Sequence, residues 1–182
     1  MTEHIQQLHQ LGQSLWYDNI SRRELENGKL AGLISHGDIR GVTSNPSIFH
    51  NAIGKTRDYD SALKPMAWSG WTADQIFNQL AIEDIRAAAD LFRPLYDQTK
   101  GGDGYVSLEV SPTLAHDTDA TLVDAKRLWA EVKRPNLMIK IPATLEGIPA
   151  IRDAIAAGLN INVTLIFSLE RYREVIQAFL VG

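Results

Sequence analysis

The sequence has 182 residues, of which 45% are hydrophobic, a formal net charge of −4 and no cysteine. This length and hydrophobic content predict a single domain, spanning residues 1–182, with one core. The acidic balance gives no electrostatic case for binding nucleic acid or an anionic membrane, and the lack of cysteine excludes disulfides, thiolate catalysis and cysteine-based metal sites.

No targeting or membrane segment is expected. The N-terminal stretch MTEHIQQLHQLGQ lacks the apolar stretch of a secretory signal. No run approaches the roughly 20 apolar residues that a membrane-spanning helix needs. The absence of cysteine is compatible with the cytosol, and we expect a cytoplasmic protein.

Short β-type runs alternate with longer helical patterns along the chain. The predicted strands are Ser14–Ile20, Ile39–Ser47, Tyr105–Pro112, Asn136–Thr144 and Asn160–Ser168. The predicted helices cover residues 21–34, a short part of 49–71, a long segment after Thr72, residues 119–133, residues 146–158 and a last segment after Ser168. This alternation predicts a parallel sheet with right-handed crossovers, either an open doubly wound sheet or a (β/α) barrel.

Capping signals support several of these boundaries. Ser21 is followed three residues later by Glu24, and Thr72 by Gln75, which is the capping-box spacing. Pro46 should end the second strand. Gly158 is a candidate for the left-handed residue that follows a helix.

The alternation of side chains within the later strands distinguishes an open doubly wound sheet from a barrel. Val106, Leu108 and Val110 share one face of their strand, opposite Ser107, Glu109 and Ser111. The fourth and fifth strands repeat this division, with Lys140 in one and with Asn162 and Thr164 in the other on the polar face. A doubly wound sheet is apolar on both faces. We therefore predict a closed (β/α) barrel whose polar side chains point inside.

Lys140 is the most informative residue of this polar face, because a buried ammonium costs several kcal/mol unless it is paired or neutralised. Taken alone, it has an ordinary explanation as a snorkelling lysine, and Glu109 as its ion-pair partner. Asn45 before Pro46 is typical of a turn, and Asp18 of a loop. Together with Thr43, however, these polar residues lie at matched positions near the ends of successive strands, where barrel active sites are built.

The residue types favour imine chemistry. The five histidines have no metal-ligand spacing, and no nucleophile-elbow or phosphate-loop motif is present, so we expect no metal and no cofactor. Desolvation favours the neutral form of a lysine, and a neutral amine can attack a ketone to form an iminium. Asp18 and Glu109 are then candidate proton shuttles, with Asn45, Asn162 and Thr164 as candidate partners of substrate hydroxyls or a water.

Five segments resemble those of the transaldolase family, in the family's order. They are SLWYDNISR, IRGVTSNPSIF, VSLEVSP, MIKIPAT and INVTLIFS. The resemblance covers essentially the whole sequence. It implies an α/β fold, the (β/α)8 TIM barrel, and an enzyme that transfers a dihydroxyacetone unit between ketose and aldose phosphates in the pentose phosphate pathway.

The resemblance also implies a role for each site residue. Lys140 is expected to form the Schiff base, and Asp18 to act as acid and base on the C4 hydroxyl. Glu109, with a water held by Thr164, is expected to shuttle protons during formation and hydrolysis of the imine. Asn45 and Asn162 are expected to hold the dihydroxyacetone hydroxyls, with Thr43 beside them.

One feature departs from the family pattern. The family barrel has eight strands, whereas this sequence supplies only about the first five β/α units and lacks the later serine–arginine segment that holds the substrate phosphate. We therefore expect an N-terminal portion of a longer protein, weakly active or inactive alone. The missing strands leave an open sheet edge, which predicts self-association.

Three other interpretations remain open. A lysine aldolase would release free dihydroxyacetone without transferring it to an acceptor. A non-catalytic fragment would pair with another chain through its exposed edge. A phosphate-binding isomerase or epimerase on the same barrel is less favoured, because it has no need for Lys140.

Overall fold

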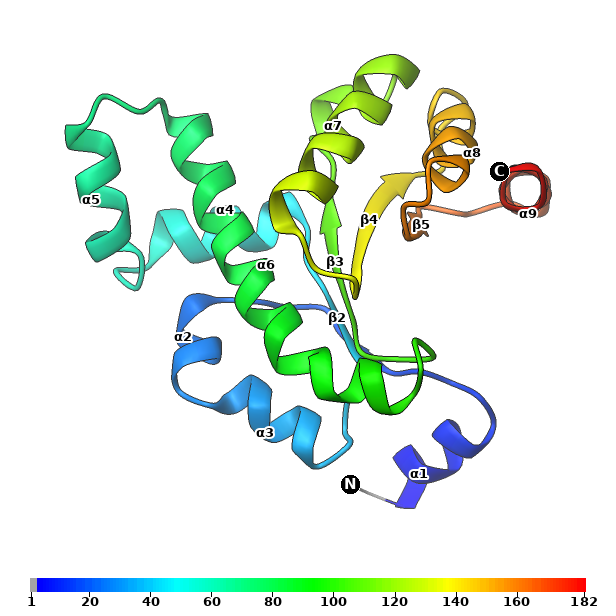
Figure 1. The fold of residues 1–182 in the computed structure, drawn as a ribbon, viewed down its shortest axis with the longest axis horizontal. Helices are drawn as coiled ribbons and strands as arrows, with labels where there is room; N and C mark the ends of the chain where they lie inside the picture. Colours follow the sequence, from blue (N-terminus) through cyan, green and yellow to red (C-terminus); the bar gives the residue numbers. More distant parts are fainter. Residues whose placement is uncertain (1–2) are drawn as a thin grey trace. The chain divides into compact units, whose positions relative to one another are not determined.

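The computed structural model describes residues 3–182. It divides into two compact units, one of residues 3–106 with 134–136, the other of residues 107–133 with 137–182. The elements of the first unit (Figure 1) are α1 (Glu3–Gln10), β1 (Trp16–Tyr17), α2 (Arg22–Glu26), α3 (Lys29–Ser35), β2 (Gly41–Thr43), α4 (Pro46–Lys55), α5 (Asp60–Trp68), α6 (Ala73–Gln98) and the start of β3 (Tyr105–Glu109). Those of the second are the rest of β3, a 3-10 turn (Pro112–Leu114), α7 (Thr118–Val132), β4 (Leu137–Pro142), α8 (Gly147–Ala156), β5 (Ile161–Thr164) and α9 (Leu169–Val181).

The strands follow one another in chain order, β1-β2-β3-β4-β5. β1 pairs with β2 and β4 pairs with β5, both in parallel. This order, with helices between the strands, confirms the predicted parallel β/α alternation. No helix among residues 3–182 is both long and apolar enough to cross a membrane.

The first two strands are shorter than the sequence pattern predicted, because helix caps follow them closely. The run from Ser14 to Ile20 contributes only the two residues of β1 to the sheet, and Ser21 already caps α2. The run from Ile39 contributes the three residues of β2. Asn45 then accepts a hydrogen bond from the Ile48 N–H and begins α4, so the strand ends before Pro46, as predicted.

The helix predicted for residues 21–34 is two helices. Gly28, in the left-handed region with φ +79°, separates α2 from α3. The N–H of Glu24 donates to the Ser21 hydroxyl, which is one half of the predicted capping box. The Glu24 carboxylate accepts instead from Lys29, Tyr17 and Asn19, so it anchors the start of α3 and the end of β1.

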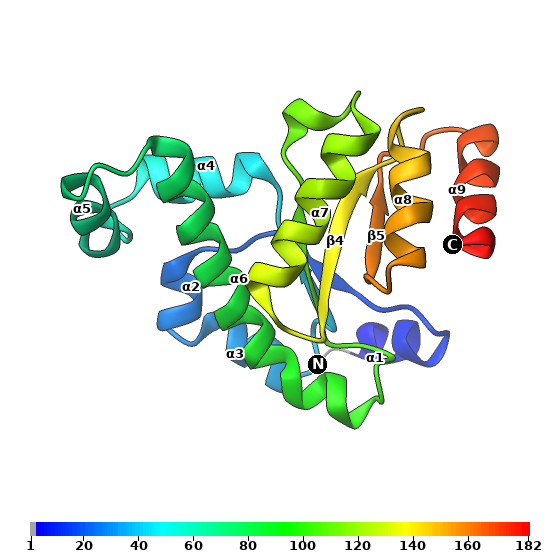
Figure 2. The same ribbon diagram turned by 45° about the horizontal axis from the view of Figure 1, so that its top comes forward.

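The long helix α6 organises the first unit. Its capping box is complete, since Thr72 and Gln75 exchange both side chain–backbone hydrogen bonds. Ala81, Ile85, Ala88 and Phe92 follow one another at spacings of three and four residues, and all four are buried on one face of the helix. Helices α2, α3 and α5 all contact α6, with α2 and α3 on the same side in Figure 2.

A polar network lies inside this otherwise apolar packing. The Tyr59 hydroxyl donates to Asp84 Oδ2 at 2.6 Å, and Arg22 Nε donates to Asp84 Oδ1 at 2.9 Å. The Arg22 guanidinium also lies 4.9 Å from the centre of the Tyr59 ring. The network therefore joins the start of α2 and the start of α5 to the middle of α6.

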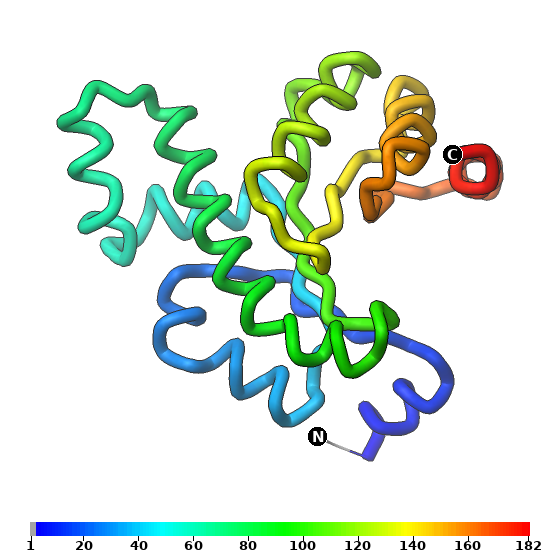
Figure 3. The backbone as a smooth tube through the Cα atoms, viewed as in Figure 1, coloured from blue at the N-terminus to red at the C-terminus, as the bar shows by residue number. Residues whose placement is uncertain are grey.

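In the second unit, β4 has the expected buried apolar face and Leu108 of β3 is buried too, whereas in β5 Ile161 and Val163 are only half-buried and Leu165 is exposed. The buried apolar residues of β3 and β4 that belong to this unit are Leu108, Leu137, Ile139 and Ile141. Helices α7 and α8 contact β4, and α8 also contacts β5 and α9 (Figure 2). Gly158, with φ +82°, ends α8 as predicted, and Ser168 caps α9 by accepting from the Arg171 N–H. Figure 3 follows the backbone from β5, in orange, to α9, in red.

Candidate active site

The second unit brings four of the predicted site residues onto adjacent strands. Glu109 is the last residue of β3, Lys140 lies in β4, and Asn162 and Thr164 lie in β5. All four are half-buried, on the faces opposite the apolar side chains. The period-two pattern of each strand is the reason, because the covering helices take every second side chain and leave the polar ones on the other face.

Lys140 and Glu109 form an ion pair. Nζ of Lys140 lies 3.3 Å from Oε2 of Glu109, and the two side chains are 13% and 15% exposed. The amine is therefore partly withdrawn from water and has a carboxylate within direct reach. This pairing offsets part of the free-energy cost of burying a lysine in an apolar strand. It also provides a group that can exchange protons with the amine.

The register of β4 and β5 sets the neighbours of this pair. Asn162 is the partner of Lys140, and Thr164 is the partner of Pro142. Side chains at partnered positions of adjacent strands point to the same side of the sheet, within about 5.5 Å at Cβ. Asn162 is thus the residue beside the amine on β5, with Thr164 one step nearer the carboxyl end of the strand.

The backbone is strained directly after Thr164. Leu165 has φ +62°, in the left-handed region that leucine rarely adopts, and its side chain is exposed. Such a conformation costs of order 1–3 kcal/mol and concentrates at functional sites. Because Leu165 directly follows Thr164 at the carboxyl end of β5, this conformation restricts the backbone next to Thr164.

Sequence analysis missed one residue of this cluster, Ser107. Its side chain is 0% exposed, and its Oγ accepts a hydrogen bond of 3.0 Å from Nδ2 of Asn162. Ser107 lies two residues before Glu109 and so on the same polar face of β3, which was the only indication in the sequence that it belongs to the site. Nothing local in the sequence indicates that the hydroxyl bonds a side chain 55 residues away.

The first unit carries the other three predicted residues, at the carboxyl ends of its strands. Asp18 directly follows β1 and is exposed, and Thr43 is the last residue of β2. Trp16 is partnered with Gly41 in the register, and a Cβ on Gly41 would lie 2.4 Å from the Trp16 indole. Trp16 therefore covers Gly41. Thr43, two residues after Gly41 in β2, lies on that same face, whereas Asp18 lies just beyond the end of β1.

Asn45 has a structural task in addition to any role in binding. Its Oδ1 accepts from the Ile48 N–H at 2.9 Å and so caps α4. The amide is thereby held with its oxygen toward the helix. In this orientation Nδ2 is the part of the side chain that can donate to a ligand.

The fold and the cluster define a class of protein: a parallel β/α protein with a half-buried lysine beside a carboxylate on neighbouring strands. Among residues 3–182, no group of three or more histidine, aspartate or glutamate side chains is arranged to hold a metal ion. Residues 15–181 match the family model described as Transaldolase/Fructose-6-phosphate aldolase. The chain belongs to this family, and its fold is that of the first five β/α units of a TIM barrel.

Curated relatives agree with this family. The chain is 52% identical over 180 residues to "Transaldolase 1" of Streptomyces avermitilis, which covers 99% of this chain and 48% of that protein. It is 52% identical over 178 residues to "Transaldolase" of Thermobifida fusca, covering 98% and 48%. It is 44% identical over 182 residues to "Transaldolase" of Trichodesmium erythraeum, covering 100% and 48%. The chain thus spans about half the length of these relatives.

Proposed function

We propose that this chain forms the Schiff-base part of a transaldolase, a transferase of the pentose phosphate pathway. It would take a dihydroxyacetone unit from sedoheptulose 7-phosphate or fructose 6-phosphate and pass it to an aldose phosphate. The observation that carries this proposal is the half-buried ion pair of Lys140 and Glu109 on the polar face of the strands. The names of the relatives support the same activity.

The proposed reaction begins at Lys140. The neutral amine attacks the C2 carbonyl of the ketose phosphate, and the carbinolamine loses water to give an iminium. Glu109, aided by a water that Thr164 holds, transfers the protons of this dehydration. Its contact with Nζ, at 3.3 Å, supports this role because a proton shuttle must reach the reacting nitrogen directly or through one water.

Cleavage of the C3–C4 bond follows. A base takes the proton of the C4 hydroxyl, the aldose phosphate leaves, and the bonding electrons pass to the iminium, which becomes an enamine. We assign this base to Asp18. We assign the dihydroxyacetone hydroxyls to Asn45 and Asn162, with Thr43 beside them. The return steps, with a different aldose phosphate as acceptor, form the new C–C bond and hydrolyse the imine.

Borohydride trapping tests the proposal. The chain is incubated with fructose 6-phosphate, reduced and digested, and its peptides are weighed. We expect a covalent three-carbon adduct on Lys140. An adduct on a different lysine would overturn the site assignment, and the absence of any adduct would overturn the proposal that this chain forms the Schiff base.

The second candidate function is that of an aldolase that releases dihydroxyacetone. This second candidate is supported by the description of the matching family, which includes fructose-6-phosphate aldolase. The two activities share the imine and differ in what ends the reaction. Release of glyceraldehyde 3-phosphate that continues without an acceptor would indicate the aldolase, whereas turnover that requires erythrose 4-phosphate would indicate the transferase.

We further propose that two copies of this chain associate through the edge at β5. β5 is the last strand of the sheet order, and an edge strand offers unpaired backbone groups to a second strand. The exposed hydrophobic residues that follow it are Leu165, Phe167, Leu169, Tyr172, Ile176, Phe179, Leu180 and Val181. A second copy presents the same edge and the same apolar residues, which suits an isologous dimer.

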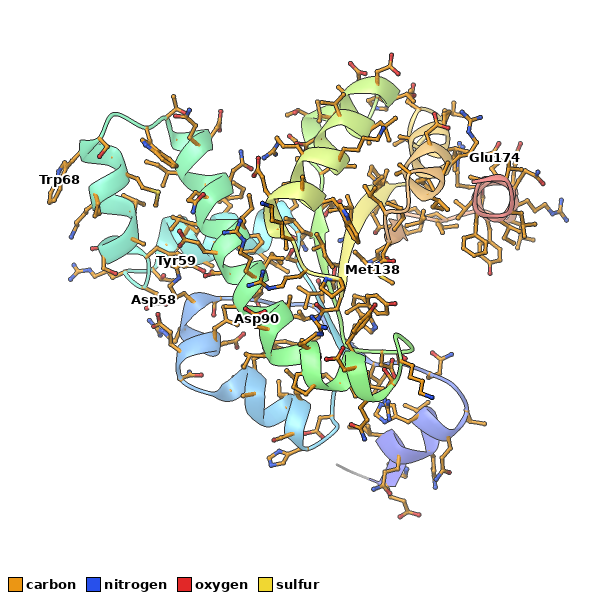
Figure 4. All side chains as sticks on the ribbon, viewed as in Figure 1. Asp58, Tyr59, Trp68, Asp90, Met138 and Glu174 are labelled. Carbon is orange, nitrogen blue, oxygen red and sulfur yellow. The ribbon has the colours of Figure 1, made fainter. Side chains whose placement is uncertain are left out.

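Light scattering over a range of concentrations tests this association. We expect a mass that rises with concentration, and a rise that Phe167→Asp reduces. Trp68→Asp is the control, because Trp68 is as exposed but belongs to α5 of the first unit, where Figure 4 shows it pointing outward. A monomer at all concentrations, or an equal effect of both variants, would contradict the proposal.

Two wider properties complete the proposal. We propose a cytoplasmic location, because the sugar phosphates named above are intermediates of central metabolism. We also propose that the two units belong to one barrel domain. β3 supports this, since Tyr105 and Val106 lie in one unit and the strand continues at Ser107 in the other.

A further inference from the structure

Two side-chain links leave the polar face of β3, from positions two residues apart. Glu109 contacts Lys140 of β4, and Ser107 accepts from Asn162 of β5. One link ends on Lys140 and the other on Asn162, and these two residues lie side by side on neighbouring strands. The lysine is thus held from one position of β3, and the residue beside it from the other.

In the structure, the hydrogen bond from Asn162 to Ser107 is made by the NH2 end of the amide. A terminal amide has two chemically different ends, a donor NH2 and an acceptor oxygen, and it turns to suit its partners. Here Nδ2 donates to Ser107 at 3.0 Å, so Oδ1 is directed away from Ser107. The oxygen is then the end of the amide that can accept a hydrogen bond from a ligand hydroxyl.

The burial of Ser107 makes this hydrogen bond hard to break. Ser107 is completely buried, whereas Asn162 is half-buried. Water cannot replace a hydrogen bond that is broken inside the protein, so the pair resists separation. A serine is also small enough for the packed interior of the sheet, where a longer polar side chain would have to displace its neighbours.

We propose that Ser107 is a positioning residue for imine formation. It holds the Asn162 amide with Oδ1 toward the site beside Lys140, where the oxygen accepts a hydrogen bond from a hydroxyl of the ketose. Ser107 thereby selects for ketoses with a hydroxyl next to the carbonyl carbon, without touching the sugar. This inference rests on the proposed function of Lys140.

The test measures how much fructose 6-phosphate is needed to trap half of the chain as the reduced adduct. Ser107→Ala should raise this half-saturating concentration about fivefold, the scale of one neutral hydrogen bond. The fraction trapped at saturation should stay the same, because Lys140 and Glu109 are intact. Ser111→Ala is the matched control: Ser111 lies two residues after β3, is exposed and is hydrogen-bonded to Thr113, so this change should leave the half-saturating concentration unaltered.

A double-mutant cycle separates positioning from a general structural role. If Ser107 acts through Asn162, Ser107→Ala should add less than a twofold effect in a chain that already carries Asn162→Ala. Equal factors in both backgrounds, or no rise from Ser107→Ala alone, would overturn the inference. If Ser107→Ala fails to fold, Ser107→Cys takes its place, since a thiol fills the position but is a weak acceptor.

The same experiment distinguishes failure of this inference from failure of the proposed function. If the unmodified chain gives no adduct on Lys140, both the proposed function and the role of Ser107 are wrong. If it gives the adduct and Ser107→Ala leaves the half-saturating concentration unchanged, only the role of Ser107 is wrong.

Discussion

Replacing Lys140 with arginine should abolish the borohydride-trapped adduct. Arginine keeps the positive charge and can still pair with Glu109, but its guanidinium does not form an imine with a ketone. If the chain turns over sugar phosphates, we expect the rate to fall by at least about 10⁴-fold, the scale seen when a covalent nucleophile is removed. Peptide mass analysis after reduction and a coupled assay of aldose phosphate release measure the two effects.

Two further variants show whether the loss belongs to the nucleophile. Lys140→Met removes both the amine and the ion pair, so it should lose the adduct as Lys140→Arg does and also leave Glu109 without its partner. Lys126→Met is the matched control, because Lys126 is an exposed lysine of α7. Its adduct should equal that of the unmodified chain. A retained adduct in Lys140→Arg would show that another amine does the chemistry.

The strand faces around Lys140 were predictable because alternation is a local property of the chain. In β3 and β4 the sequence alone separates the buried residues, such as Leu108 and Ile139, from Glu109 and Lys140. Once parallel order is assumed, matched parity brings Lys140 and Glu109 to the same side, and the structure has them 3.3 Å apart. The link from Asn162 to Ser107 could not be predicted in this way, because parity gives the face but not the partner.

The helices show a similar division between local and tertiary information. Caps at Thr72 and Ser168 were predictable, since both bonds involve residues three positions away. The break at Gly28 was missed, although an asparagine–glycine pair is a turn signal. Helix α1 was also missed: in its eight residues only Ile5 and Leu8 are large and apolar, and neither is buried.

The role of Asp84 lay outside the reach of sequence patterns. A charged residue in a helix is expected on the solvent side. Asp84 is instead 2% exposed, because Tyr59 and Arg22 reach it from other parts of the first unit. Burial raises the pKa of this carboxyl, and it outweighs the lowering by the Tyr59 hydroxyl and the Arg22 guanidinium. Burial, together with the bond to Asp84, also raises the pKa of Tyr59.

Replacing Asp84 with alanine should strongly destabilise the chain. The change removes the acceptor of two hydrogen bonds and leaves the Arg22 guanidinium and the buried Tyr59 hydroxyl without it. Breaking one side of a buried pair costs about 3–5 kcal/mol, and in a chain of this size each kcal/mol lowers the melting temperature by about 2–4 °C. We therefore expect a fall of roughly 6–20 °C, measured by the loss of circular dichroism on heating.

Glu83→Ala is the matched control for this prediction, since Glu83 is the adjacent residue of α6 and also pairs with Arg22, at 3.0 Å. Its side chain is 38% exposed, so water replaces much of what the pair provides, and an exposed pair contributes about 1 kcal/mol or less. Asp84→Asn should fall between the two, because the amide oxygen can still accept from Tyr59 while the charge that faces Arg22 is lost. If Glu83→Ala lowered the melting temperature as much as Asp84→Ala, burial would not be what makes the network stabilising.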